Sequence, residues 1–325
     1  MRVRQDRRSS SLEPQTINHF AGQPGVTERV RVALEHCWTD SVRFPHSAIT
    51  GPPGTGKTTI AHLIGRELGV TVHELLAQAV NSIGAMRGAL LATAEKEILF
   101  LDEAHQLDAD VQVLLYRAME ARILTVNHGD RQTMTLPLAN FSVLLATTDF
   151  YRLAEPLRDR CALILPFQHY EEAALTRITT NHAKGLQIEL DSAIATGIAQ
   201  RARGTPRLAI RLLNACHRYM RSRGENQITA DHFSRSLELE GLDSLGLDAD
   251  QQRYLRMLAS RDGEPLRLFT ISSSLGIHRR TLQEVIEPFL LRSGLIERVQ
   301  NGRLITSRGL EHLGLLSKCQ EAASR

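Results

Sequence analysis

Short apolar segments alternate with amphipathic segments over the first half of the chain. The apolar segments are aliphatic and partly β-branched, which is typical of strands buried on both faces of a parallel sheet. They are Ser47–Thr50, Val70–Val72, Glu97–Leu101, Phe141–Ala146 and Ala162–Leu165. Helical spacing of apolar residues separates them, over Val26–Trp38, Thr58–Leu68, Ser82–Ala94 and Val111–Glu120. This alternation predicts an α/β domain with a parallel sheet.

One segment of this half has a period of two instead. From Ile123 to Thr135, polar and apolar residues alternate around Asn127-His128-Gly129-Asp130, which predicts a β-hairpin. A hairpin inserted between a helix and the next buried strand is either a plain surface element or a projecting contact device. The pattern leaves both interpretations open.

The next part of the chain has only helical periodicity. The expected helices are Glu171–Lys184, Asp191–Arg201, Pro206–Arg223 and Ala230–Leu239, with Thr205 as a candidate N-cap. A linker rich in Gly, Asp and Ser, Gly241–Leu247, follows. We therefore expect a small all-helical domain.

The C-terminal part combines helices with a hairpin. Helices are expected over Ala249–Ser260, Leu268–Leu275 and His278–Glu287, the last ending near Pro288, and strands over Leu295–Val299 and Arg303–Thr306 around Asn301-Gly302. This order predicts a winged helix, which is a relative of helix-turn-helix DNA readers. Candidate phosphate contacts are Arg279, Arg280, Arg298 and Arg303. Winged helices also dock proteins, and that alternative stays open.

Composition agrees with several folded domains and excludes some classes. The 325 residues are 42% hydrophobic and 23% charged with a net charge of +3, so a strongly basic protein is excluded. The four cysteines are far apart, with no C-x-x-C pair, which argues against disulfide or zinc frameworks and favours a cytoplasmic location. We see no apolar run of about 18 residues and no signal peptide, so no membrane is expected.

The charge pattern and the element pattern together suggest domain boundaries. A basic flexible tail spans residues 1–15, with contact to nucleic acid as the less favoured role. The large α/β domain spans 16–167, the helical domain 168–242 and the winged helix 243–318.

A phosphate-binding loop of the pattern G-x-x-x-x-G-K-[ST] lies between a predicted strand and a predicted helix. Its sequence is Gly51-Pro-Pro-Gly54-Thr-Gly56-Lys57-Thr58. Its glycines let backbone N–H groups surround a polyphosphate, and the helix N-terminus and Lys57 add positive charge. Thr58 offers a hydroxyl to Mg²⁺. A nucleoside triphosphate with Mg²⁺ is therefore the expected ligand, and the family resemblance given below implies that it is ATP.

A second cluster of candidate residues follows the predicted strands. Asp102 and Glu103 end one strand, where Asp102 is placed to hold Mg²⁺ through water and Glu103 to activate the attacking water. Thr148 follows another strand and is expected near the γ-phosphate. Arg160 precedes an edge strand and can reach a neighbouring subunit's nucleotide. Arg207, at a helix N-terminus, is explained by a nearby phosphate.

In this order, the motifs resemble those of AAA+ ATPases, and most specifically RuvB-type Holliday-junction branch-migration motors. The resemblance covers Ala21 to Gly314 and rests on AGQPGV, GPPGTGKTT, LFLDEAHQL, YRAME, PLRDR, RARGTPRLAIRLL and LQEVIEPFLLRSGLIERVQNGRLIT. It implies a three-part fold: a P-loop AAA+ domain with a parallel sheet, a helical lid and a winged helix. It further implies a hexameric ring that moves duplex or four-way-junction DNA in recombination and repair, with a RuvA-type protein as a partner at the hairpin.

The resemblance also assigns roles residue by residue. Asp102 and Glu103 are the acidic pair, Thr148 the polar sensor, Arg160 the arginine finger and Arg207 the lid sensor. Nucleotide contacts are expected from Phe20, Ala21, Gly51, Pro52, Gly54, Thr55, Gly56, Lys57, Thr58, Thr59, Pro206 and Arg207.

The chain departs from the family pattern at surfaces that meet partners. Asp149 stands where an arginine is usual, Glu13-Pro14 replaces an Arg-Pro pair, and Asn301 replaces an arginine in the wing turn. The loop near Asn81-Ser82 lacks a basic residue, and the hairpin is shorter with a less apolar tip. Two alternatives to the motor therefore stay open: a nucleotide-switched adaptor whose winged helix and hairpin bind proteins, and a diverged relative that hydrolyses ATP slowly.

Overall fold

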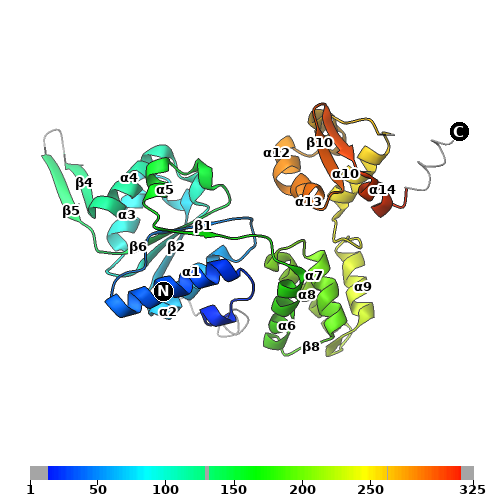
Figure 1. The fold of residues 1–325 in the computed structure, drawn as a ribbon, viewed down its shortest axis with the longest axis horizontal. Helices are drawn as coiled ribbons and strands as arrows, with labels where there is room; N and C mark the ends of the chain where they lie inside the picture. Colours follow the sequence, from blue (N-terminus) through cyan, green and yellow to red (C-terminus); the bar gives the residue numbers. More distant parts are fainter. Residues whose placement is uncertain (1–13, 129–131, 262, 316–325) are drawn as a thin grey trace. The chain divides into compact units, whose positions relative to one another are not determined.

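A computed structural model describes residues 14–128, 132–261 and 263–315 (Figure 1). The chain forms two compact units, Met1–Leu213 and Asn214–Arg325. This division falls inside a helix, so it differs from the expected three-part division, which stays a prediction. The predicted basic tail and the tip of the predicted hairpin lie outside the described residues, apart from Pro14 and Gln15.

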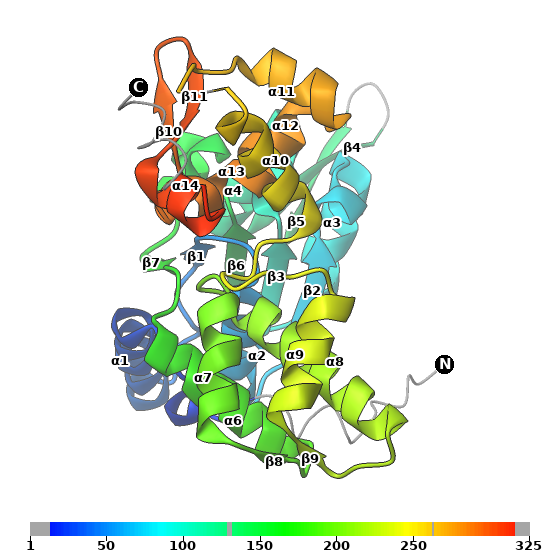
Figure 2. The same cartoon turned by 90° about the vertical axis from the view of Figure 1, so that its right-hand side faces the viewer.

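The first unit is built on a five-stranded parallel sheet with the order β2-β3-β6-β1-β7 (Figure 2). The strands are β1 (Ser47–Thr50), β2 (Val72–Leu76), β3 (Ile98–Asp102), β6 (Ser142–Thr147) and β7 (Leu163–Pro166). Ser47 pairs with Leu144 of β6 and with Leu163 of β7, so β1 lies inside the sheet and β7 at its edge. The predicted α/β class and the edge position of the last strand are confirmed.

Two hydrophobic cores cover the two faces of this sheet. On one face, Ile98 and Phe100 of β3 pack in the core formed with α1 (Pro24–Asp40) and α2 (Lys57–Leu68) (Figure 1). On the other face, Leu99 and Leu101 pack in the core formed with α3 (Ile83–Ala92), α4 (Ala109–Ala121) and α5 (Glu155–Asp159). Successive strand residues point to opposite faces, which is why the strand is apolar throughout.

One predicted strand is displaced along the sequence. The expected strand at Val70–Val72 is observed as β2 from Val72 to Leu76. Gly69 ends α2 in the left-handed conformation, and the Val70 N–H donates to the Gly65 carbonyl at 2.9 Å. Val70 therefore completes a helix C-cap and is not available to start the strand.

The remaining elements of the first unit include the predicted hairpin. Its strands are β4 (Ile123–His128) and β5 (Gln132–Pro137), which pair antiparallel. The helical segment contains α6 (Glu172–Gly185), α7 (Ser192–Arg201) and the start of α8 (Pro206–Ser222). The prediction of helix alone between Tyr170 and Leu239 is wrong in one respect, because two short strands interrupt it. They are β8 (Glu189–Leu190) in the first unit and β9 (Gln227–Ile228) in the second. Short 3₁₀ turns are η2 (Ile17–His19), η3 (Ala77–Val80), η4 (Ala104–Gln106) and η5 (Phe150–Arg152).

The second unit contains the predicted winged helix. Its elements are α9 (Ala230–Leu239), α10 (Ala249–Ala259), α11 (Leu268–Leu275), α12 (Arg279–Thr281), the π-helical turn η6 (Leu282–Ile286), α13 (Glu287–Arg292), β10 (Ile296–Val299), β11 (Gly302–Ile305) and α14 (Ser307–His312). In the hairpin, Val299 pairs with Gly302, so the loop is Gln300-Asn301 and not the expected Asn301-Gly302. A Cβ on Gly302 would lie 2.2 Å from the Leu266 carbonyl oxygen, so this glycine serves a close backbone approach.

The helix expected to end near Pro288 continues past it to Arg292. Pro288 has no N–H to donate and its ring would clash with a carbonyl in a regular α-helix. The π turn before it changes the register: the Glu287 N–H donates to the Leu282 carbonyl, five residues back. The widened turn accommodates the proline and lets the helix go on.

A buried ion-pair network joins this helix to the hairpin. The Glu287 side chain has no solvent exposure. Arg298 donates to its Oε2 at 2.8 Å, Arg303 donates to Oε1 at 2.9 Å and to Oε2 at 3.3 Å, and the Tyr254 hydroxyl donates to Oε1 at 2.8 Å. Burial alone would raise the pKa of Glu287, but the arginines and the tyrosine outweigh burial and lower it below its ordinary value.

Among the described residues, no helix is both long and apolar enough to cross a membrane.

We expect Glu287→Ala to destabilise the second unit by about 3–5 kcal/mol, because it leaves the Arg303 guanidinium and the Tyr254 hydroxyl without their buried carboxylate. Glu284→Ala is the matched control, since Glu284 lies on the same helical stretch in an exposed pair with Arg280 and should cost at most about 1 kcal/mol. Urea unfolding and hydrogen exchange of the hairpin amides measure both. Equal effects of the two variants would contradict the role of the network.

The same network predicts a direction for the pH dependence of stability. Because the native pKa of Glu287 lies below its ordinary value of 4.5, its contribution is complete above that pH and is lost as the pH falls through the native pKa. Exchange of the hairpin amides should therefore accelerate on acidification in the natural chain and less so in Glu287→Ala.

Candidate functional site

The phosphate loop lies between β1 and α2, as predicted. The buried Lys57 ammonium donates to the carbonyl oxygens of Gly51 and Pro52 at 2.9 and 3.0 Å. Burial lowers the pKa of Lys57, and the nearby carboxylates of Glu103 and Asp102 oppose this change. An ammonium held in this way, next to a helix N-terminus, is a binding site for anionic oxygen.

The helical segment contacts this loop at two points. The Tyr170 hydroxyl donates to the Thr55 carbonyl at 2.9 Å. The backbone N–H of Arg207 donates to the Gly54 carbonyl at 3.3 Å. Gly54 has a φ of +75°, and a Cβ there would lie 2.9 Å from the Arg207 Cβ. The loop and the start of α8 therefore fit together only with glycine at position 54.

The predicted acidic pair stands at the end of β3. Glu103 has left-handed backbone angles (φ 52°, ψ 42°), and its N–H donates to Asp102 Oδ1 at 2.9 Å. A non-glycine residue in this region is strained, and such strain is concentrated at functional sites. Both carboxylates line a cavity of about 220 Å³, together with Gly54, Gly56, Lys57, Thr58, Thr59, Pro206 and Arg207. The structure therefore brings the loop, the acidic pair and Arg207 to one place.

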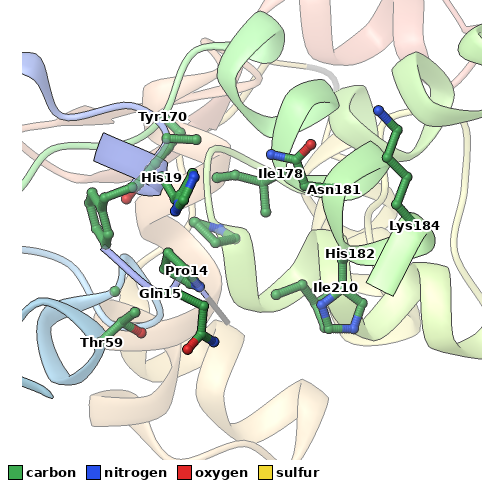
Figure 3. A pocket seen from close by; sticks show the side chains of 14 residues that line it. Pro14, Gln15, His19, Thr59, Tyr170, Ile178, Asn181, His182, Lys184 and Ile210 are labelled. Atoms are coloured by element: carbon green, nitrogen blue, oxygen red, sulfur yellow. The ribbon is translucent and has the colours of Figure 1, made fainter. Parts of the chain in front are cut away.

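A second cavity of about 610 Å³ shares four residues with the first, namely Gly56, Thr59, Pro206 and Ile210. The predicted contacts Phe20 and Ala21 are among its lining residues. Figure 3 shows Ile178 and Asn181 on the helical segment, on the side of His19. The two cavities together form one elongated site, with a charged part at the loop and a more apolar part beside it.

Sequence reasoning missed most of the residues that line the larger cavity, including those of the helical segment. The missed lining residues are Pro14, Gln15, His19, Tyr170, Ile178, Asn181, His182, Lys184 and Ile210. The spacing of Ile178, Asn181 and His182 places them on one helix face, but nothing in that pattern distinguishes a cavity wall from a packed core. Gly51, Pro52 and Thr55 line neither cavity; they form the loop itself, in which the Thr55 hydroxyl donates to the Pro52 carbonyl.

The segment after β6 holds the predicted sensor. Thr148 is exposed, directly after the strand, and it lines neither cavity. The preceding Thr147 is fully buried, and its carbonyl accepts the Gly51 N–H at 3.2 Å. Thr147 therefore links the end of β6 to the first residue of the loop, a contact that sequence reasoning missed.

Arg160 lies at the end of α5, just before the edge strand β7. Its guanidinium donates to Glu120 at 2.6 Å, and the side chain is 34% exposed. It lines neither cavity of its own chain. Two residues away, the Arg158 guanidinium stacks on Phe150 and Tyr151 at 5.6 and 5.5 Å from the ring centroids. Arg160 is thus held at the surface. Arg158 packs against aromatic rings and is not a second candidate for the arginine finger.

The predicted DNA contacts of the winged helix fall into two pairs. Arg279 and Arg280 are exposed at the start of the helical stretch that contains η6, and Arg280 pairs with the exposed Glu284. Arg298 and Arg303 both bind the buried Glu287, and only Arg298 is substantially exposed, at 50% against 14%. Arg303 therefore has an internal structural role.

These features define an AAA+ ATPase: a phosphate loop after β1, an acidic pair after β3, a polar strand end between them, and an arginine delivered by a helical segment. Comparison with known protein families identifies the family within this class. The Holliday junction DNA helicase RuvB P-loop domain matches residues 12–167, the RuvB AAA lid domain 170–243 and the RuvB C-terminal winged helix domain 244–314.

Whole proteins agree with these matches. The Holliday junction branch migration complex subunit RuvB of Anaeromyxobacter sp. (strain Fw109-5) is 37% identical over 314 residues, covering 95% of this chain and 92% of that protein. The subunit of the same name from Rubrobacter xylanophilus is 33% identical over 308 residues, covering 94% and 87%. The Thermotoga maritima RuvB Holliday junction branch migration motor superimposes with a TM-score of 0.81 at 32% identity, over 93% of this chain and 98% of that chain.

The chain belongs to the RuvB family of Holliday junction DNA helicases. The predicted family, the fold class and the function of an ATP-driven DNA motor of recombination and repair are confirmed at the level of this family. Nucleotide binding at the phosphate loop is confirmed in the same way.

We expect Gly54→Ala to weaken nucleotide binding about tenfold or more, because the left-handed backbone angle is unfavourable for alanine and its Cβ would press on Arg207. Gly69→Ala is the matched control: its φ of +67° carries a similar backbone penalty, but no atom lies within 4 Å of the new Cβ. Titration with a fluorescent ATP analogue measures affinity, and thermal melting confirms that both variants fold. Equal affinities would show that the contact between the loop and α8 is irrelevant to binding.

Proposed function

We propose that this chain is one subunit of a hexameric ring that hydrolyses ATP to move DNA at a four-way junction. The observation that carries the proposal is the position of Arg160. It stands at the surface before the edge strand, lines no cavity of its own chain, and is held by one exposed carboxylate from which a phosphate can displace it. Such an arginine completes the site of a neighbouring subunit.

Within one subunit, the elongated site accommodates a nucleoside triphosphate. The triphosphate lies at the loop near Lys57 and Arg207, and the base and ribose lie in the larger cavity beside Phe20 and Ala21. Glu103 accepts a proton from the attacking water. The sensor role of Thr148 stays a prediction, because Thr148 lines neither cavity. Desolvation of Lys57 strengthens its attraction to the phosphates.

The same cavity fits Mg²⁺. Its hydroxyl and carboxylate donors, Thr58 and Asp102, are oxygen ligands of the kind Mg²⁺ prefers. When bound, Mg²⁺ neutralises charge that develops on the phosphates.

The output surfaces are the winged helix and the hairpin. Arg279, Arg280 and Arg298 supply positive charge to DNA phosphates. On the β4–β5 hairpin, the exposed side chain of Met134 provides an apolar contact for a RuvA-type junction-binding protein. The Anaeromyxobacter relative is named as a subunit of a branch migration complex, which supports such a partnership.

A second candidate function is a nucleotide-switched adaptor that binds proteins. Phe269 on α11 and Val285 on η6 are 68% and 66% exposed, which is unusual for a surface that contacts only phosphates. Arg303, one of the four predicted DNA contacts, is occupied by Glu287. DNA binding therefore separates the two functions.

For the shared site, we expect Arg160→Ala to lower steady-state ATP hydrolysis by at least about 10³-fold, because an arginine finger stabilises charge in the transition state. Glu103→Gln should be similarly inactive. Mixing the two should restore part of the activity, since an Arg160→Ala subunit keeps its own Glu103 and can receive Arg160 from its Glu103→Gln neighbour.

Arg152→Ala is the control for this experiment, because Arg152 is an exposed arginine of the nearby η5. It should leave hydrolysis unchanged. Full hydrolysis by Arg160→Ala alone, or no recovery on mixing in oligomers of confirmed size, would remove the finger assignment.

For DNA, we expect the double variant Arg279→Ala/Arg280→Ala to bind four-way-junction DNA more weakly and with a shallower salt dependence. Each lost phosphate contact lowers the slope of log K against log salt by about one. Arg235→Ala on α9, an exposed arginine paired with Glu238, is the control and should bind like the natural chain. Unchanged affinity and slope in the double variant, or flat salt dependence in the natural chain, would favour the adaptor.

A further inference from the structure

His105 occupies a position between the acidic pair and the end of β6. It lies in the η4 turn that follows Glu103, and its side chain is only 10% exposed. Its Nδ1 is 3.1 Å from the Thr147 hydroxyl and 3.4 Å from Glu103 Oε2. One ring nitrogen therefore faces both the side chain expected to activate water and the strand that lies between the acidic pair and the phosphate loop.

We propose that His105 is a positioning residue for ATP hydrolysis, which holds the Glu103 carboxylate against Thr147. The proposal rests on the role of Glu103 given above and adds a residue that acts through it.

The hydrogen-bond roles follow from the chemistry of the three groups. An ionised carboxylate has no proton to donate, so the tautomer that attracts Glu103 is the one with an N–H at Nδ1. The Thr147 hydroxyl oxygen already accepts the Asp149 N–H at 3.0 Å, and it can accept from Nδ1 as well. The imidazole Nδ1 is thus hydrogen-bonded to Thr147 and lies within ion-pair distance of the Glu103 carboxylate. The ring is held because it is nearly enclosed, and it holds the carboxylate in turn.

Glu103 needs such a holder. A side chain that is 35% exposed has room for other rotamers, and the Glu103 backbone is in the strained left-handed conformation. A general base works only within hydrogen-bond reach of the water it activates, and a small displacement lowers the rate strongly. Fixing one rotamer of Glu103 therefore affects the rate of the hydrolysis step and leaves the affinity for nucleotide unchanged.

The network also connects two other parts of the site. The Thr147 carbonyl accepts the N–H of Gly51, the first residue of the phosphate loop, and the hydroxyl accepts the N–H of Asp149, just after Thr148. A shift of the loop or of the segment after β6 therefore reaches Glu103 through Thr147 and His105, which are in direct contact with each other.

The test compares full-length His105→Ala, His105→Asn and Thr147→Val. Asparagine places an amide N–H near the position of Nδ1, and valine removes the hydroxyl at nearly constant volume. We expect His105→Ala to lower kcat about 10- to 100-fold with unchanged KM and unchanged affinity for an ATP analogue, since positioned general-base catalysis contributes on the order of 10²-fold or more. His105→Asn should recover most of kcat, and Thr147→Val should lower it several-fold.

The double variant His105→Ala/Glu103→Gln shows whether His105 acts through Glu103. It should be no slower than Glu103→Gln alone, because the group that His105 positions is already lost. His62→Ala is the control for loss of an imidazole, since His62 lies on the exposed side of α2 in a pair with Glu74, and it should leave kcat unchanged.

The outcomes separate this inference from the proposed function. An active Glu103→Gln variant would overturn the role of Glu103 itself. An inactive Glu103→Gln variant beside a fully active His105→Ala variant would overturn only the positioning role. A His105→Ala variant that loses nucleotide affinity in parallel with kcat, or that asparagine does not rescue, would likewise exclude it, because His105 would then be a folding residue.

Discussion

The position of β6 between β3 and β1 is the constraint on which the rest of the site depends. Parallel strands end at one edge of the sheet, so this order places the end of β6 between the acidic pair and the phosphate loop. The Thr147 carbonyl can then reach Gly51 on one side, and its hydroxyl can reach His105 on the other. The chain that leaves β6 runs through α5 to the edge strand β7, which puts Arg160 at the surface.

Much of the fold could be predicted because its signals are local. Glycines and a lysine at fixed spacing define the loop, and apolar runs ending in Asp-Glu or Thr-Thr define two strands with their functional ends. The misplaced boundaries have equally local causes that an apolar pattern does not encode. Val70 looks like a strand residue but caps α2, and Pro288 looks like a helix end but follows a π turn that accommodates it. The sequence shows the proline but gives no sign of the extra residue in the preceding turn.

The side-chain pairings could not be predicted, because they depend on distant residues meeting in space. Arg298 and Arg303 look like surface cations in the sequence, yet both bind a carboxylate on another element. His105 lies within a recognised motif, but its contact with Thr147 spans 42 positions. The larger cavity is hidden for the same reason, since Ile178 and Asn181 are far in sequence from Phe20 and Thr59. Motifs identify the residues that are predicted to touch phosphate, while the residues that hold and enclose them emerge only with the tertiary structure.

The length and position of helix α8 connect the two compact units. The helix begins next to Gly54 of the phosphate loop and runs unbroken for 17 residues, past the boundary between the two compact units at Leu213. A helix of this length is a rod of roughly 25 Å at 1.5 Å per residue. The first turn beside the phosphate loop and the start of the second unit therefore belong to one continuous, internally hydrogen-bonded element.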